Sequence, residues 1–82
     1  MKFNGNIEGT RKEVGFETRG KFKRRNCTLY VVITEEEGVV RVSHFHRFDG
    51  AFVIDAHDNY EVKSSFWETV ACESAKLEAL GN

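Results

Sequence analysis

Hydrophobic and polar residues alternate along several segments in the first two thirds of the chain. In residues 12–23, apolar Val14, Phe16 and Phe22 alternate with charged or small side chains. A period of two is typical of a strand with one buried face and one solvated face. The same pattern predicts four strands, over residues 12–23, 28–35, 39–47 and 51–57, with residues 2–7 as a candidate fifth strand at one edge.

The spacing of apolar residues changes to that of a helix after residue 64. Ser65 and Glu68 fit a capping box, in which the serine precedes the helix and the glutamate is its third residue. Gly81 stands where a helix-ending glycine is expected. The pattern therefore predicts a helix over residues 66–80. Its apolar stripe comprises Phe66, Trp67, Val70, Ser74, Leu77 and Leu80.

In this order, the predicted elements form an α+β fold. The expected architecture is an antiparallel β-meander of four to five strands, with one C-terminal amphipathic α-helix packed on one face of the sheet. The chain has 82 residues, which is the size of a single small domain spanning 1–82.

Two turns set the expected register of the strands. Asp49–Gly50 stands between two apolar runs, which predicts a two-residue type I′ turn. That turn would place His44 opposite Asp55. A three-residue loop over 36–38, with its glycine in the left-handed region, would place Tyr30 opposite the same histidine.

This register divides the side chains between two faces, because directly paired residues point to the same side of a sheet. The first face is almost wholly apolar and is expected to hold the helix: Leu29, Val31, Ile33, Val39, Phe45, Phe52, Ile54 and Ala56. The second face is mixed. One helix covers one face only, so the second would need the N-terminal segment, a second copy or a partner to cover it. Its candidate partner-binding residues are Tyr30, Val32, Val42, His44, His46 and Val53.

The net charge of −1 conceals an uneven distribution of charge. Residues 1–26 hold eight Lys and Arg against three acids, whereas residues 27–82 hold four against ten. Such a chain can present a basic and an acidic surface to different partners. The acidic flank comprises Glu35, Glu36, Glu37 and Asp58. A basic row that could follow a phosphate backbone, beside aromatic side chains that stack on bases, comprises Arg19, Lys21, Lys23, Arg24 and Arg25.

All three histidines of the chain lie within residues 43–58. His44 and His46 are two residues apart on a predicted strand, so they would point to the same side about 6.6 Å apart. With Asp55 opposite, they form a candidate metal site. The alternative is an ordinary ion pair on a solvated face, and that is the outcome we expect.

Several classes of function have no signature in this sequence. It contains no nucleophile elbow and no phosphate-binding glycine loop, so we expect neither an enzyme nor a cofactor. Cys27 and Cys72 fit no metal motif and are expected to be buried thiols. No apolar run is long enough to span a membrane, and the first nine residues lack the apolar core of a signal peptide. We therefore expect a cytoplasmic protein with no membrane partner.

These patterns favour a small non-enzymatic interaction protein. It would bind a larger protein, or a second copy of itself, through the open sheet face and the acidic flank. An inhibitor of a nucleic-acid-handling host complex, encoded by a phage or mobile element, fits this size and charge layout. An RNA- or single-stranded-DNA-binding module that uses residues 19–25 is the first alternative, and a metal-binding protein is the second.

Overall fold

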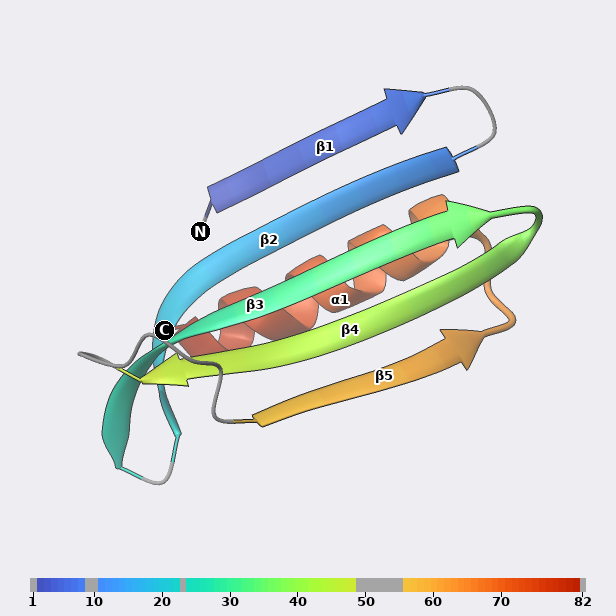
Figure 1. The fold of residues 1–82 in the computed structure, drawn as a ribbon. Helices are drawn as coiled ribbons and strands as arrows, with labels where there is room; N and C mark the ends of the chain where they lie inside the picture. The colour runs from blue at the N-terminus through green and yellow to red at the C-terminus, as the bar shows by residue number, and fades with distance from the viewer. Residues whose placement is uncertain (1, 9–10, 23, 49–55, 82) are drawn as a thin grey trace.

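The computed structural model describes residues 2–8, 11–22, 24–48 and 56–81. Within them, five antiparallel strands form one sheet in chain order: β1 (Lys2–Glu8), β2 (Arg11–Phe22), β3 (Arg25–Glu36), β4 (Val39–Phe48) and β5 (Ala56–Val62). The helix α1 (Phe66–Gly81) follows and lies against one face of the sheet (Figure 1). The predicted α+β meander with a C-terminal helix is confirmed, and so is the edge strand near the N-terminus.

The helix begins where the capping signal predicts. The backbone N–H of Glu68 donates to Ser65 Oγ at 3.3 Å, and that of Thr69 donates to the Ser65 carbonyl oxygen at 3.0 Å. The Thr69 hydroxyl donates to the same carbonyl oxygen at 2.8 Å. The bond to Ser65 Oγ satisfies a first-turn N–H group that has no backbone partner, and the Thr69 N–H bond is the first of the regular helical bonds. Ser65 therefore acts as the N-cap.

The core lies between the sheet and α1. The sheet contributes Val14, Phe16, Cys27, Leu29, Val31, Ile33, Val40, Val42 and Phe48, and the helix contributes Phe66, Val70 and Leu77. Most of the sheet residues are β-branched or aromatic, as expected for a half-buried strand surface. The helix packs mainly on β2 and β3, so β5 lies beside the helix instead of beneath it (Figure 1).

The turn between β3 and β4 contains two residues, Glu37 and Gly38, instead of the three predicted. Their φ angles are 52° and 79°, and a type I′ turn needs positive φ at both positions. The predicted three-residue loop placed only Gly38 in the left-handed region of backbone conformation. In the structure Glu37 lies in that region as well. The pairing is thereby shifted by one residue, and Val31 lies opposite His44 where Tyr30 was predicted.

The last strand lies further along the chain than predicted. β5 spans Ala56–Val62, not 51–57, and residues 49–55, which include the predicted Asp-Gly turn, lie outside the described residues. His44 pairs with Asp58, three residues beyond its predicted partner. The prediction followed the most apolar run, but an edge strand with one open face can be largely polar, as β5 is.

These shifts exchange the two faces of β4, because a slip of one residue turns every side chain to the other side. The side chains that face α1 are those of Val40, Val42, His44, His46 and Phe48. Val39 and Phe45, predicted beneath the helix, point to the opposite side. The partition was right for β3, where Leu29, Val31 and Ile33 lie in the core, and wrong for β4. Phe52, Val53 and Ile54 lie outside the described residues.

The helix buries a stripe that differs from the predicted one at three positions, Trp67, Thr69 and Glu73. Phe66, Val70 and Leu77 are buried as predicted, but Trp67 is 52% exposed. Thr69 and Glu73, which are polar, are buried instead. The buried positions follow helical spacing from the first helical residue, and the tryptophan lies outside that stripe. A carboxylate in the helix–sheet interface is the unexpected feature.

The two thiols differ in their surroundings. Cys27 is fully buried in the core, as expected, whereas Cys72 is exposed on α1, contrary to the prediction. Among the residues that the structure describes, no helix has the length and apolarity needed to cross a membrane.

Two adjacent valines on β3 can test which face of this strand packs against α1. Val31 is 3% exposed beneath α1, whereas Val32 is half-buried on the other side. Val31→Ala should lower the free energy of unfolding by about 2 kcal/mol, because it removes buried methyl groups and leaves a cavity. Val32→Ala should cost less than about 1 kcal/mol. Urea denaturation measures both values. Equal losses would mean that the assignment of faces is wrong.

Candidate functional site

The structure offers two candidate sites, one on each side of the sheet. The first is the face opposite α1, which no described helix or strand covers (Figure 1). At its centre Tyr30 on β3 pairs directly with Phe45 on β4, and both side chains are half-buried. Two residues nearer the β2–β3 turn, Arg19, Thr28 and Arg47 form a row across three strands. We call this surface the open face.

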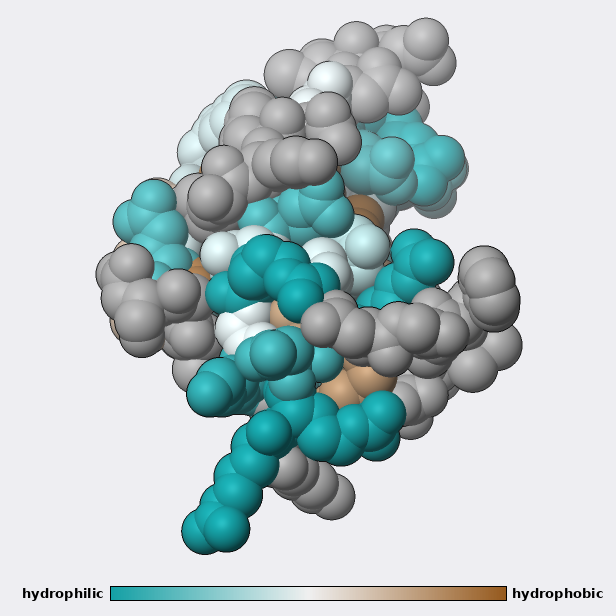
Figure 2. Space-filling view, turned by 90° about the vertical axis from the view of Figure 1, so that its left-hand side faces the viewer, coloured by the Kyte–Doolittle hydropathy of each residue, from teal (hydrophilic) through white to brown (hydrophobic). Residues whose placement is uncertain are grey.

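Positive charge on the open face gathers toward the β2–β3 turn. Arg19 and Arg47 are exposed, and Arg19 donates to Thr28 Oγ1 at 3.1 Å. Lys21, two residues further along β2, is exposed on the same side. Figure 2 views the molecule from this end, and its described residues are mostly hydrophilic. Toward the other end, Arg41 pairs with an acid, Glu61, at 2.9 Å.

The basic row predicted over residues 19–25 is divided by the fold. Arg19 and Lys21 lie on the open face. Arg25 points to the other side, where its guanidinium lies 4.1 Å from the centre of the Phe48 ring. Arg24 is exposed in the turn with a φ of 67°, and Lys23 lies outside the described residues. Arg47, which was not predicted, joins the row from β4.

The predicted partner-binding residues do not share one face. Tyr30 and Val32 lie on the open face, but Val42 is fully buried under α1, and His44 and His46 also face the helix. Val53 lies outside the described residues. The one-residue shift in register at the β3–β4 turn is the reason that the β4 residues lie on the other side of the sheet from the β3 residues.

The predicted acidic flank is also divided. Glu36 and Glu37 are exposed at the β3–β4 turn, and Glu35 forms an ion pair with Lys12 at 3.8 Å. Asp58 does not belong with them. It lies four residues before the end of β5 that adjoins this turn, about 13 Å away at the usual rise of a strand.

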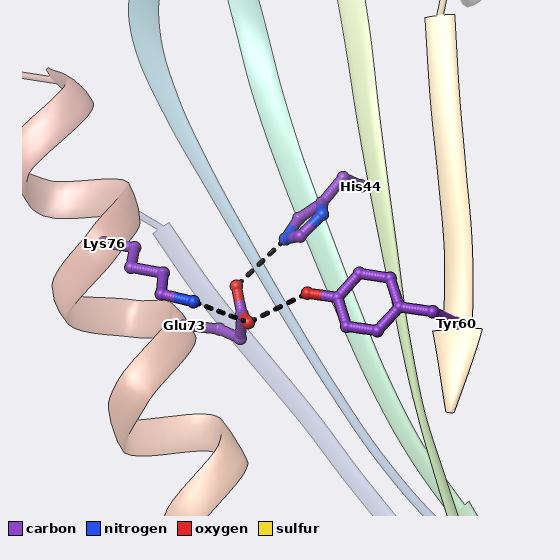
Figure 3. A network of polar contacts seen from close by, with 4 residues as sticks. All are labelled: His44, Tyr60, Glu73 and Lys76. Atoms are coloured by element: carbon purple, nitrogen blue, oxygen red, sulfur yellow. Dashed lines mark hydrogen bonds and ion pairs between the residues drawn. The ribbon is translucent and has the colours of Figure 1, made fainter. Parts of the chain in front are cut away.

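The second candidate site is built around Glu73, whose side chain is only 5% exposed. Three side chains converge on its carboxylate from β4, β5 and α1 itself (Figure 3). His44 Nε2 lies 2.9 Å from Oε2, the Tyr60 hydroxyl donates to Oε1 at 3.2 Å, and Lys76 Nζ lies 3.6 Å from Oε1. A buried carboxylate needs such partners, because losing water costs several kcal/mol.

These contacts decide the charge state of the network. Burial raises the pKa of Glu73, but the hydrogen bond from His44, the charges of His44 and Lys76, and the hydrogen bond from Tyr60 lower it more. The pKa of Glu73 therefore lies below its ordinary value of 4.5. Burial and the neighbouring carboxylate raise the pKa of Tyr60. At neutral pH the glutamate is ionised and the tyrosine is a neutral donor.

A pocket of about 240 Å³ adjoins this network on the α1 side of the sheet. Leu29, Val31 and Leu77 give it apolar walls. Its polar lining comes from His44, His46, Asp58, Glu73 and Lys76. Tyr30 and Phe45, whose side chains belong to the open face, also contribute to the lining. The pocket can exist because α1 packs mainly on β2 and β3, which leaves room beside β4 and β5.

The predicted metal site is not assembled in the way the sequence indicated. His44 and His46 do point to the same side, but the residue opposite His44 is Asp58. Asp55 lies outside the described residues. Within the described ranges, no three His, Cys, Asp or Glu side chains are grouped so that they could hold a metal ion.

Sequence reasoning missed Glu73 and Tyr60. The glutamate stands three residues after Val70 and four before Leu77, so helical spacing alone could have placed it on the buried stripe. Tyr60 was missed because it lies beyond the predicted last strand.

Glu73→Gln should lower the free energy of unfolding by about 1–3 kcal/mol at pH 7, because it removes a buried charged acceptor. A carboxylate whose pKa is lower in the folded state stabilises the fold above its unfolded pKa, and this is lost as the pH falls through the folded value. The difference between wild type and variant should therefore shrink below pH 4.5.

Denaturation curves between pH 3 and pH 7 check this expectation. Glu78→Gln, at an exposed glutamate on the same helix, is the matched control and should follow the wild-type profile. Profiles of wild type and Glu73→Gln that stay parallel down to pH 3 would show that this carboxylate is not coupled to folding.

The two sites, the open face and the Glu73 pocket, differ in chemistry as well as in position. The open face offers aromatic rings beside guanidinium groups, whereas the pocket offers apolar walls beside a fixed hydrogen-bond network. No protein-family model, curated protein or solved structure matches this chain.

Proposed function

We propose that this protein binds single-stranded nucleic acid on the open face. The observation that carries the proposal is the Tyr30–Phe45 pair beside the Arg19–Arg47 row, on a sheet face that no described element covers. Stacking of a base on an aromatic side chain contributes about 1–3 kcal/mol, and arginines bind the phosphates of the same strand.

The spacing of these groups suits two neighbouring nucleotides. Strands lie about 4.8 Å apart, so the two arginines, on either side of β3, are separated by roughly 10 Å. The aromatic pair lies two residues along the strands, or about 6.6 Å from the arginine row. A nucleic-acid backbone can follow the arginines while its bases turn onto the rings.

A single strand fits this surface better than a duplex. The faces of the bases in a duplex are stacked on one another, so aromatic rings cannot reach them without unstacking. A sheet face with central aromatic residues binds unstacked bases directly, and phosphate contacts add affinity that does not depend on sequence.

The open face is less suited to a protein partner than the sequence indicated. Val42 was expected there, but it lies in the core, as do Val40 and Phe48 on the same strand. Among the described residues, the large apolar side chains on this face are Tyr30, Val32, Val39 and Phe45. The charged side chains around them include Arg19, Arg47 and Glu17, of which Glu17 pairs directly with Tyr30. A smaller, more charged patch favours an anionic ligand over an apolar protein surface.

A protein partner is a second proposal, for a different part of the surface. Trp67 is 52% exposed at the start of α1, and this end of the molecule also carries the β3–β4 turn with Glu36 and Glu37 (Figure 1). Tryptophan is enriched among residues that dominate binding energies. This acidic end with its indole ring fits a partner that has a basic surface.

Fluorescence anisotropy with a labelled oligonucleotide of about twelve nucleotides tests the first proposal. Arg19→Glu with Arg47→Glu should abolish binding, because two phosphate contacts become repulsive. Tyr30→Ala should weaken binding by roughly 5- to 150-fold, the equivalent of about 1–3 kcal/mol. Binding by the wild type should weaken steeply as salt is added.

Arg11→Glu is the matched control, because Arg11 is exposed at the opposite end of β2. It should reduce affinity much less than the double variant. No binding by the wild type at low salt would refute the proposal and leave the acidic end as the better candidate. An equal loss in Arg11→Glu would show that only overall charge matters.

A further inference from the structure

We infer that the pocket beside Glu73 binds a small neutral heterocycle with an N–H group next to a carbonyl, the edge found in a free nucleobase such as uracil. The site is separate from the proposed nucleic-acid surface, because it lies on the α1 side of the sheet. It is also not assigned by any sequence pattern described above. Its size, its walls and its fixed hydrogen-bonding groups each restrict the ligand.

The volume and the walls favour a flat ring. Drug-sized ligands occupy pockets of about 300–1,000 Å³, and this pocket has about 240 Å³. Leu29 and Val31 come from a strand, and Leu77 faces them from the helix. These three side chains are only 3–5% exposed, so they form the floor of the pocket, and a small flat ring can rest on the parts of them that line it.

His44 provides an acceptor when its imidazole is neutral. The ionised Glu73 carboxylate accepts a hydrogen bond from His44 Nε2 at 2.9 Å. In the neutral imidazole this contact keeps the proton on Nε2, so Nδ1 carries a lone pair. Because His44 also lines the pocket, a ligand that donates an N–H to this ring is favoured.

Lys76 provides the complementary donor. Its ammonium group has three N–H donors and forms an ion pair with Glu73 Oε1 at 3.6 Å, which is longer than a hydrogen bond. The side chain is 63% exposed and lines the pocket, so it can turn toward a carbonyl oxygen of a ligand. An N–H donor and a carbonyl acceptor on neighbouring ring atoms match this pair of protein groups.

Charges around the pocket favour a neutral ligand. Lys76 offsets the charge of Glu73, and Asp58, which also lines the pocket, adds a negative charge. Carboxylates and phosphates are repelled by these two acids. A cation would have to displace the lysine ammonium from Glu73. A neutral lactam avoids both penalties.

Titration with uracil, followed by ¹⁵N NMR at pH 8, tests the inference. Uracil should shift the amide signals of Leu29, Val31 and Leu77 and the imidazole nitrogens of His44. The control ligand is 1,3-dimethyluracil, which keeps both carbonyls but has no N–H group. It should bind about tenfold more weakly, because it leaves the imidazole acceptor without a partner.

Two variants test the roles of the polar groups. Glu73→Gln keeps the shape but lets the amide donate as well as accept, so His44 is no longer held in one tautomer, and the preference for uracil should shrink. Lys76→Met, at an exposed position that tolerates substitution, should weaken uracil binding by about fivefold or more. The Arg19→Glu, Arg47→Glu double variant should bind uracil like the wild type, since it alters only the open face.

Three results would overturn the inference. They are the absence of any shift at millimolar uracil, equal affinity for 1,3-dimethyluracil, and unchanged uracil affinity in Lys76→Met. Shifts confined to the open face, and lost in the arginine double variant, would also overturn it and would instead support the nucleic-acid proposal. If the wild type binds uracil but shows no oligonucleotide binding at low salt, the nucleic-acid proposal alone is contradicted.

Discussion

The length of the Glu37–Gly38 turn determines which side chains of β4 meet the helix. With two residues in the turn, both in the left-handed region, the even-numbered side chains of β4 face α1. His44 can then reach Glu73, and Val42 enters the core, while Phe45 is left on the open face. One more residue in the turn would reverse all of these positions. Both candidate sites therefore depend on the conformation of two residues.

The buried carboxylate then fixes how the helix lies on the sheet. Its partners come from β4, β5 and α1, so the bonds can form together only when these elements are correctly placed (Figure 3). Apolar contacts between helix and sheet are less demanding, because they tolerate small rotations and shifts. A misplaced helix would leave an ionised group without partners in a medium of low dielectric constant. We therefore expect Glu73 to restrict the position of the helix on the sheet.

Local patterns predicted the elements well, because each depends on residues close together in the chain. The alternation around Val14 and Phe16 gave β2, and Ser65 gave the start of the helix. The register could not be derived in the same way, because it depends on backbone angles in a turn where glutamate occupies a glycine-like conformation. The Glu73 network could not be predicted for the same reason. The position of His44 depends on the register of both the β3–β4 pair and the β4–β5 pair. The open face was predicted more accurately, because its aromatic and basic residues on β2 and β3 lie on the same side of the sheet in either register.

β4 contributes neighbouring residues to both surfaces. His44 lines the pocket and Phe45 belongs to the open face, with a single peptide bond between them. A backbone shift of β4 therefore moves both surfaces at once. Thermodynamic linkage requires that any such coupling be reciprocal: whatever factor one ligand imposes on the affinity for the other, it experiences in return. If both proposed ligands bind, a shift of β4 caused by the ligand in the pocket would change the affinity of the open face for nucleic acid.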